Sequence, residues 1–184
     1  MPNSKFEMFS VTNILILANV FVFLGTKSFV NADLFFGLNG HFVHSSLWHQ
    51  PLTSMFMHAN EIHIFMNMFV LFQFGNALEN IIGKLKFFAL YMFGGILTSL
   101  LTFLYIQNFA YEHNVVGASG VICMLLGFFS MIEKQSQKAI FIWVLLISFG
   151  PLLIGQNVAW YGHLAGYLSG ILIYFVSKIL ANSH

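Results

Sequence analysis

Residues 117–132 read GASGVICMLLGFFSMI, a turn of small residues followed by an apolar run that stops at Glu133 and Lys134. As a helix, a run of about 14 residues rises about 21 Å, whereas the hydrocarbon core of a bilayer is about 30 Å thick. With Glu133 and Lys134 at one membrane surface, the turn would lie below the opposite surface. Irregular backbone at that depth is tolerated only where protein buries it or water lines it. The stretch therefore predicts an internal, wet cavity around Ser119.

The composition of the whole chain is typical of a membrane protein. Hydrophobic residues make up 58% of its 184 residues, charged residues make up 7%, and the mean hydropathy is +0.81. A soluble domain normally carries about 25% charged residues. The formal net charge of +1, without a basic patch, argues against nucleic acid as a partner. With the single cysteine Cys123, no intrachain disulfide can form.

Six apolar runs predict an all-α, six-helix membrane bundle that forms one domain over residues 1–184. No small-residue cleavage site follows the first run, so we interpret it as a retained span rather than a signal peptide. The connection from Lys27 to Asn60 is rich in Gly, Asn, His and Phe, and we expect it to lie half-embedded in the membrane interface. The predicted spans are residues 9–26, 61–82, 87–107, 119–132, 139–155 and 159–179.

The lysines predict how these spans are oriented, because basic residues favour the cytoplasmic side of a membrane. Lys27, at the outer end of the first span, is the single exception to the pattern. We therefore expect a multi-pass protein of the cell inner (plasma) membrane with both termini in the cytoplasm, so that spans two, four and six start at the outer face. The lysines expected on the cytoplasmic side are Lys5, Lys84, Lys86, Lys134, Lys138 and Lys178.

Two polar residues lie near the outer starts of spans four and six, and polar residues inside a membrane indicate functional sites. Ser119 begins span four, where unpaired backbone N–H groups of the helix end could stabilise an oxyanion. His163 lies at a similar depth in span six, and a Ser–His pair is what an activated nucleophile requires. Beside His163, Gly162, Gly166 and Gly170 form a ridge that another helix can approach closely. Helix packing alone stays open as the alternative for all of these residues.

A third polar group leads into span two. His63 and Asn67 are spaced i, i+4 and so share one helix face, and His58 lies just before the span. Histidine and asparagine side chains are suitable oxyanion donors, although hydrogen bonding between helices is an alternative. The chain has 8 histidines, but their spacing here does not suit a metal, and no carboxylate beyond Glu61 is near. We therefore expect neither a metal nor another cofactor.

Taken together, these motifs resemble the rhomboid family of intramembrane serine proteases, in a minimal six-helix bacterial form. The resemblance covers essentially the whole chain, and its motifs occur in order on the expected spans. Each motif alone is weak, but the set is specific. The motifs read Gly117-Ala118-Ser119-Gly120, Gly162-His163-x2-Gly166-x3-Gly170 and His58-x4-His63-x3-Asn67, with the family-like stretches Leu52–Met57 and Gly75-x3-Glu79-x3-Gly83.

The resemblance implies a Ser–His dyad without a third acid. Ser119 would attack the scissile carbonyl and form an acyl-enzyme, and His163 would accept the serine proton and return it to the leaving amine. The oxyanion would be held by the backbone N–H of Ser119 and the side chains of His63 and Asn67. Span five would be the lateral gate for the substrate. Supporting residues would be His58, Gly117, Gly166 and Gly170.

The chain departs from the family pattern at two places. Trp48-His49-Gln50-Pro51 stands where many members have Trp-Arg, which leaves the anchoring of the first loop open. Cys123 stands where some members carry a tyrosine that stacks on the catalytic histidine, so we expect His163 to be held less firmly. Cys123 itself is interpreted as a small core residue, because buried thiols are usually inert.

The sequence therefore predicts a serine endopeptidase that cuts transmembrane substrate proteins among the membrane lipids, near the outer face. The alternative is a catalytically inactive rhomboid-like protein that binds membrane clients. A third interpretation, a small transporter or metal permease, would need an intramembrane charge pathway, which the sequence lacks. The substrate and the oligomeric state are not predicted.

Overall fold

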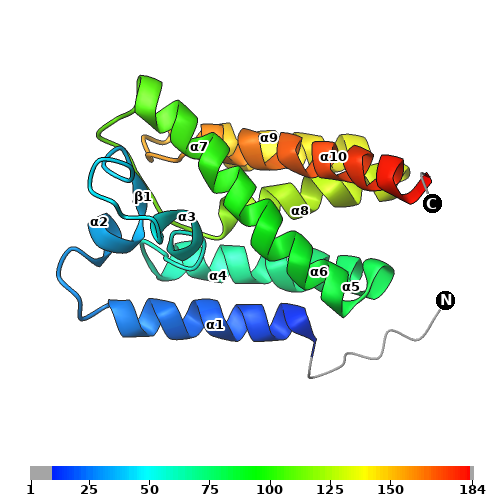
Figure 1. Cartoon of the computed structure of the whole chain (residues 1–184), viewed down its shortest axis with the longest axis horizontal. Helices are drawn as coiled ribbons and strands as arrows, with labels where there is room; N and C mark the ends of the chain where they lie inside the picture. The colour runs from blue at the N-terminus through cyan, green and yellow to red at the C-terminus, as the bar shows by residue number, and fades with distance from the viewer. Residues whose placement is uncertain (1–9, 183–184) are drawn as a thin grey trace.

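The computed structural model describes residues 10–182, which are mostly helical (Figure 1). Phe9 and Lys5, used above for the first span and for its orientation, lie outside this part of the chain. Two-residue strands β1 (Leu38–Asn39) and β2 (Asn114–Val115) pair antiparallel. The helices are α1 Val11–Thr26, α2 Ala32–Phe36, α3 Gln50–Thr53, α4 Glu61–Val70, α5 Asn76–Ile82, α6 Lys84–Ala89, α7 Gly95–Phe109, α8 Ser119–Ile132, α9 Gln137–Leu153 and α10 Trp160–Asn182, with π-helical segments η1 Leu71–Gly75 and η2 Leu90–Gly94 and a 3-10 turn η3 Lys134–Ser136.

The helices follow the predicted spans closely. Residues 61–82 are covered by α4, η1 and α5 without a break, and α8 has the predicted bounds 119–132. The other helices differ from the predicted spans by a few residues at their ends, where helix boundaries are least defined. Within residues 10–182, three helical segments are long and apolar enough to cross a membrane, whereas α1 and α8 are apolar but shorter. The three segments are Lys84–Phe109, Lys134–Leu153 and Trp160–Asn182.

The surface of the bundle is strongly apolar, as a lipid-facing surface must be. Phe21 on α1 is 79% exposed, Ile62 on α4 is 77% exposed, and Phe93 in η2 is 74% exposed. Soluble monomers rarely expose large contiguous apolar patches, whereas such surface is normal in contact with lipid tails. The exposed large side chains therefore agree with the composition: this is a membrane protein.

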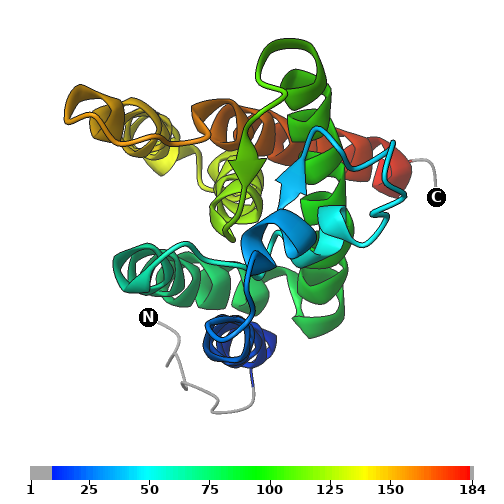
Figure 2. The same cartoon turned by 90° about the vertical axis from the view of Figure 1, so that its left-hand side faces the viewer.

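The two ends of the bundle are formed by different elements. Figure 1 shows the start of α1, the α5–α6 junction and the end of α10 at one end, and α2, β1 and α3 at the other. Figure 2 views the molecule from the second end, where the connection between α1 and α4 lies beside the helix ends. Lys27, the exception in the lysine pattern, belongs to this end and forms an exposed ion pair with Glu61. Its charge is thus locally compensated.

The connection between α1 and α4 is held by side chains that bond to its own backbone. Gln50 is fully buried, and its Nε2 donates to the carbonyl oxygen of Leu34 at 3.0 Å. Thr53 Oγ1 donates to the carbonyl oxygen of Phe36 at 2.7 Å. Trp48, in contrast, is 65% exposed. In the altered Trp48–Pro51 segment the anchoring residues are therefore Gln50 and its neighbour His49, whose Nε2 lies 2.9 Å from the carbonyl oxygen of Phe35.

The first helix begins on the carboxylate of Glu79. The backbone N–H groups of Val11 and Thr12 donate to Glu79 at 2.8 Å each, and Thr12 Oγ1 donates at 2.7 Å. A carboxylate at a helix start satisfies N–H groups that the helix itself cannot pair and complements the helix dipole. Glu79, although inside a predicted span, therefore has a structural role at the end of the bundle where α1 begins.

Helix α8 lies at the centre and packs most tightly against α10. Every residue from Val121 to Phe128 is buried, as expected for a short helix that is apolar all round. A Cβ on Gly166 would lie 2.3 Å from the carbonyl oxygen of Gly120, and one on Gly170 would lie 2.0 Å from that of Met124. The two backbones are therefore in direct contact. Gly166 and Gly170 leave the space in which this contact forms.

Gly162 differs from the other two glycines of the ridge. A Cβ there would meet Thr102 of α7 at 3.4 Å, which is an ordinary contact distance. The carbonyl oxygen of Gly162 lies 3.8 Å from the position of a Cβ on Gly120, so Gly162 is still near α8, but less tightly than the two later glycines.

We predict that Gly170→Ala destabilises the bundle by about 2–3 kcal/mol, because the added methyl overlaps backbone atoms that cannot move independently. Gly150→Ala is the matched control, since a Cβ there meets nothing within 4 Å. It should be neutral or stabilising by about 0.5–1 kcal/mol, because alanine favours a helix over glycine. Thermal unfolding of the detergent-solubilised variants measures both. Equal stability of the two variants would contradict the backbone contact.

Candidate active site

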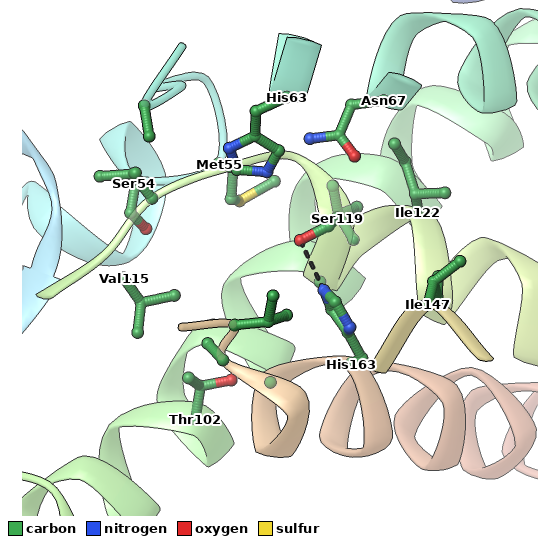
Figure 3. A pocket seen from close by; sticks show the side chains of 18 of the residues that line it. Ser54, Met55, His63, Asn67, Thr102, Val115, Ser119, Ile122, Ile147 and His163 are labelled. Atoms are coloured by element: carbon green, nitrogen blue, oxygen red, sulfur yellow. Dashed lines mark hydrogen bonds between the residues drawn. The ribbon is translucent and has the colours of Figure 1, made fainter. Parts of the chain in front are cut away.

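Ser119 and His163 form a hydrogen-bonded pair between α8 and α10. His163 Nε2 lies 2.9 Å from Ser119 Oγ, as the dashed line in Figure 3 marks. His163 is 6% exposed, and Ser119, at the first position of α8, is half-buried. The glycine contact between the two helices places these side chains within reach of each other. The sequence predicted a similar depth for the two residues, and the structure brings them together.

His163 has a second hydrogen-bond partner that sequence reasoning missed. Its Nδ1 lies 3.2 Å from Oγ of Ser148 on α9, and the Ser148 hydroxyl lies 2.6 Å from the carbonyl oxygen of Val144. Ser148 is completely buried. The signal in the sequence is that Ser148 is a hydroxyl residue within the otherwise apolar stretch from Ala139 to Leu153.

The turn before Ser119 is fixed by residues that precede α4. Gly117 has φ of +129°, and its N–H donates to the carbonyl oxygen of Ser54 at 2.9 Å. The N–H of Ala118 donates to Nε2 of His58 at 3.5 Å. Burial lowers the pKa of His58 to about 4, so its ring is neutral and this nitrogen can accept. His58 therefore bonds the turn, and within residues 10–182 it has no hydrogen bond to Ser119 or His163.

His63 and Asn67 project from α4 towards the same turn, and Figure 3 places both on the side of Ser119 opposite His163. A Cβ on Gly117 would lie 2.7 Å from the His63 ring, so only glycine fits beneath that ring. The Nδ2 atom of Asn67 is buried without a hydrogen-bond partner among residues 10–182. A buried, unpaired donor costs about 1–3 kcal/mol. Such a donor beside a hydroxyl can bind an incoming oxygen.

A cavity of about 670 Å³ opens onto this cluster. Its polar wall contains Ser119, His163, His63 and Asn67, and much of the rest is apolar. Two apolar rows with helical spacing flank it, from α4 and from α9. They comprise Ile62, Met66 and Val70 on α4, and Trp143, Ile147 and Pro151 on α9. A cavity thus opens at Ser119, as the sequence predicted, and it can accept an apolar chain segment.

Cys123 lies on α8 close to the α10 backbone. It is fully buried as a free thiol, and its Cβ is 3.2 Å from the position of a Cβ on Gly166. Within residues 10–182, no aromatic ring contact to His163 is present. No group of three or more His, Cys, Asp or Glu in that part of the chain could hold a metal ion.

Comparison with known proteins identifies the family that this arrangement belongs to. Residues 44–178 match the Rhomboid domain family. YdcA of Bacillus subtilis is 30% identical over 139 residues, which are 70% of this chain and 67% of that protein. Rhomboid protease GlpG of Haemophilus influenzae is 26% identical, over 76% of this chain and 74% of that protein. The mitochondrial Rhomboid protein 1 of Saccharomyces cerevisiae is 30% identical, over 68% of this chain but only 41% of its own length.

We predict that Gly117→Ala costs more stability than Gly155→Ala. Both glycines have positive φ, at +129° and +74°, so both substitutions strain the backbone by about 1–3 kcal/mol. Only at Gly117 does the new methyl also collide with a side chain, His63, whereas Gly155 has nothing within 4 Å. The additional loss should be about 1–3 kcal/mol. Chemical unfolding in detergent measures it, and equal losses would mean that His63 does not pack on the turn.

Proposed function

The chain belongs to the rhomboid family, and we propose that it is an intramembrane serine endopeptidase that hydrolyses peptide bonds of transmembrane substrate proteins. The observation that carries this proposal is the 2.9 Å contact between His163 Nε2 and Ser119 Oγ at the wall of an apolar cavity. A serine hydroxyl is a weak nucleophile unless a base stands within hydrogen-bond reach. Here that base is present, and a substrate segment has room beside it.

In the proposed reaction Ser119 Oγ attacks the scissile carbonyl carbon while its proton passes to His163 Nε2. The imidazolium then gives this proton to the leaving amine, which departs and leaves an acyl-enzyme on Ser119. A water molecule repeats the sequence with His163 as the base, and the carboxylate product is released. Because His163 is buried, few water molecules compete for its nitrogen.

The negative oxygen that develops during the attack needs donors on the side of Ser119 away from the base. Three groups are suited to this role: the backbone N–H of Ser119 at the helix start, the His63 ring and the Nδ2 atom of Asn67. The unpaired state of Asn67 Nδ2 supports its assignment, because the donor stands ready without having to break another bond. His58 and Gly117 would keep the turn in place, and neither takes part in the chemistry.

We further propose that the chain spans the bacterial inner membrane six times, with both termini in the cytoplasm. α8 would be the short fourth span, with the Ser119 end sunk below the outer surface. The start of α1 and the end of α10 lie at the same end of the molecule, which supports an even number of crossings. Substrates would enter between α4 and α9, whose apolar rows line the cavity, so α9 would act as the lateral gate.

The orientation predicts which surface residues are reachable from outside the cell. Glu112, before β2, and Gln135, in η3, are both exposed, whereas the native Cys123 is fully buried and provides a blank. In intact cells, Glu112→Cys should react with a membrane-impermeant maleimide, and Gln135→Cys should react only after the cells are opened. The reverse pattern would contradict the proposed topology.

The proposed activity predicts that the purified protein in detergent cleaves a model transmembrane substrate. Ser119→Ala and His163→Ala should each lower the rate by more than about a thousandfold, because each removes half of the dyad. Asn67→Ala should lower kcat by about a hundredfold, the typical loss of one oxyanion donor.

Cleavage that survives Ser119→Ala would refute the mechanism. A wild-type protein that folds, binds membrane segments and cleaves none of them would instead favour an inactive rhomboid-like protein that binds membrane clients.

A further inference from the structure

A histidine that acts as a base towards Ser119 must carry its own proton on the other ring nitrogen. For His163 this means a proton on Nδ1 and a free lone pair on Nε2, the nitrogen that faces Ser119 Oγ. In a Ser-His-Asp triad a buried carboxylate fixes this tautomer. Within residues 10–182, no Asp or Glu is hydrogen-bonded to His163. Some other acceptor must therefore select the tautomer here.

Ser148 provides that acceptor. Its hydroxyl lies 2.6 Å from the carbonyl oxygen of Val144, one helical turn earlier on α9, and a carbonyl oxygen can only accept. The single hydroxyl proton of Ser148 is therefore donated to Val144. Ser148 Oγ can then only accept a hydrogen bond, and Nδ1 of His163 lies 3.2 Å from it. Only a protonated Nδ1 completes this hydrogen bond, so the ring carries its proton on Nδ1.

We propose that Ser148 is the positioning residue of the catalytic base: it holds the proton on His163 Nδ1 and turns Nε2 towards Ser119. This inference deepens the proposed protease function and rests on it. Ser148 is 0% exposed and His163 is 6% exposed, so water has little access to replace the lost acceptor. Ser148 thus fixes the tautomer and the orientation of the histidine ring, as the acid does in a triad, but it does so without a charge.

The size of the effect follows from the absence of that charge. Replacing a triad carboxylate so that the wrong tautomer forms lowers kcat by about 10⁴. Hydrogen bonds to ionised groups are roughly twice as strong as those between neutral groups, so a serine should contribute far less. We expect Ser148→Ala to lower kcat about tenfold and to leave KM unchanged, because Ser148 touches the base and not the substrate.

The test compares Ser148→Ala with Ser130→Ala. Ser130 is also fully buried in a helix, and it bonds the carbonyl oxygen of Gly127 and the hydroxyl of Tyr167, away from the site. Both variants lose a buried hydroxyl and one interhelical hydrogen bond. Ser148→Thr, which keeps the hydroxyl, should restore most of the rate.

The second readout is the tautomer of His163 itself, which does not depend on catalysis. Nitrogen-15 NMR of histidine-labelled protein in micelles distinguishes the two tautomers, and His163→Gln assigns the signal. We expect the Nδ1-protonated form in the wild type and in Ser130→Ala, and its loss or mixing with the other form in Ser148→Ala.

An unchanged tautomer in Ser148→Ala, together with a kcat equal to that of Ser130→Ala, would overturn the inference and leave the protease function intact. If the wild type cleaves nothing, the proposed function fails, and the NMR comparison alone then decides whether Ser148 sets the proton position. Retention of the Nδ1-protonated form in Ser148→Ala would overturn the inference in that case too.

Discussion

The backbone contact between α8 and α10 is the constraint on which the rest of the structure depends. Gly166 and Gly170 let the two helices touch at the carbonyl oxygens of Gly120 and Met124, where a single methyl group would overlap backbone atoms. Because lipid tails are as apolar as the side chains, such close packing is a main source of helix association in a membrane. The same contact brings His163 to within 2.9 Å of the serine that begins α8. The same contact between α8 and α10 therefore stabilises the bundle and sets the geometry of the site.

Two features that lower the stability of the fold, a strained backbone and an unpaired donor, lie beside the packed helices α8 and α10 at the site. Gly117 holds a backbone conformation that other residues rarely adopt, and Asn67 Nδ2 is buried without a partner among residues 10–182. Strain and unpaired donors of this kind persist only where the surroundings hold them in place. Here the surroundings are the bonds from Ser54 and His58 to the turn, and the buried length of α8 behind it. The turn before Ser119 and the Asn67 donor are thus already in position before a substrate binds.

Much of the bundle could be predicted from the sequence, because apolar runs and lysine positions determine where spans start and stop. The family comparisons confirm the resemblance that the motifs indicated. What could not be predicted depends on how separate segments meet. In the sequence Ser148 cannot be distinguished from a serine that only packs between helices. Its role is visible only when the turn after α9 places it beside His163. Gln50 reads as an ordinary polar loop residue until its burial is known, and β1 and β2 are too short to leave a pattern.

If His163 activates Ser119, the serine should react with a fluorophosphonate, and this reaction is the most direct test because no substrate needs to be known. Mass spectrometry of the labelled protein should locate the adduct on Ser119 in the wild type. His163→Ala should abolish the adduct in protein that still unfolds cooperatively, because the hydroxyl loses its base. Labelling of another residue, or labelling of Ser119 at an undiminished rate in His163→Ala, would contradict the account.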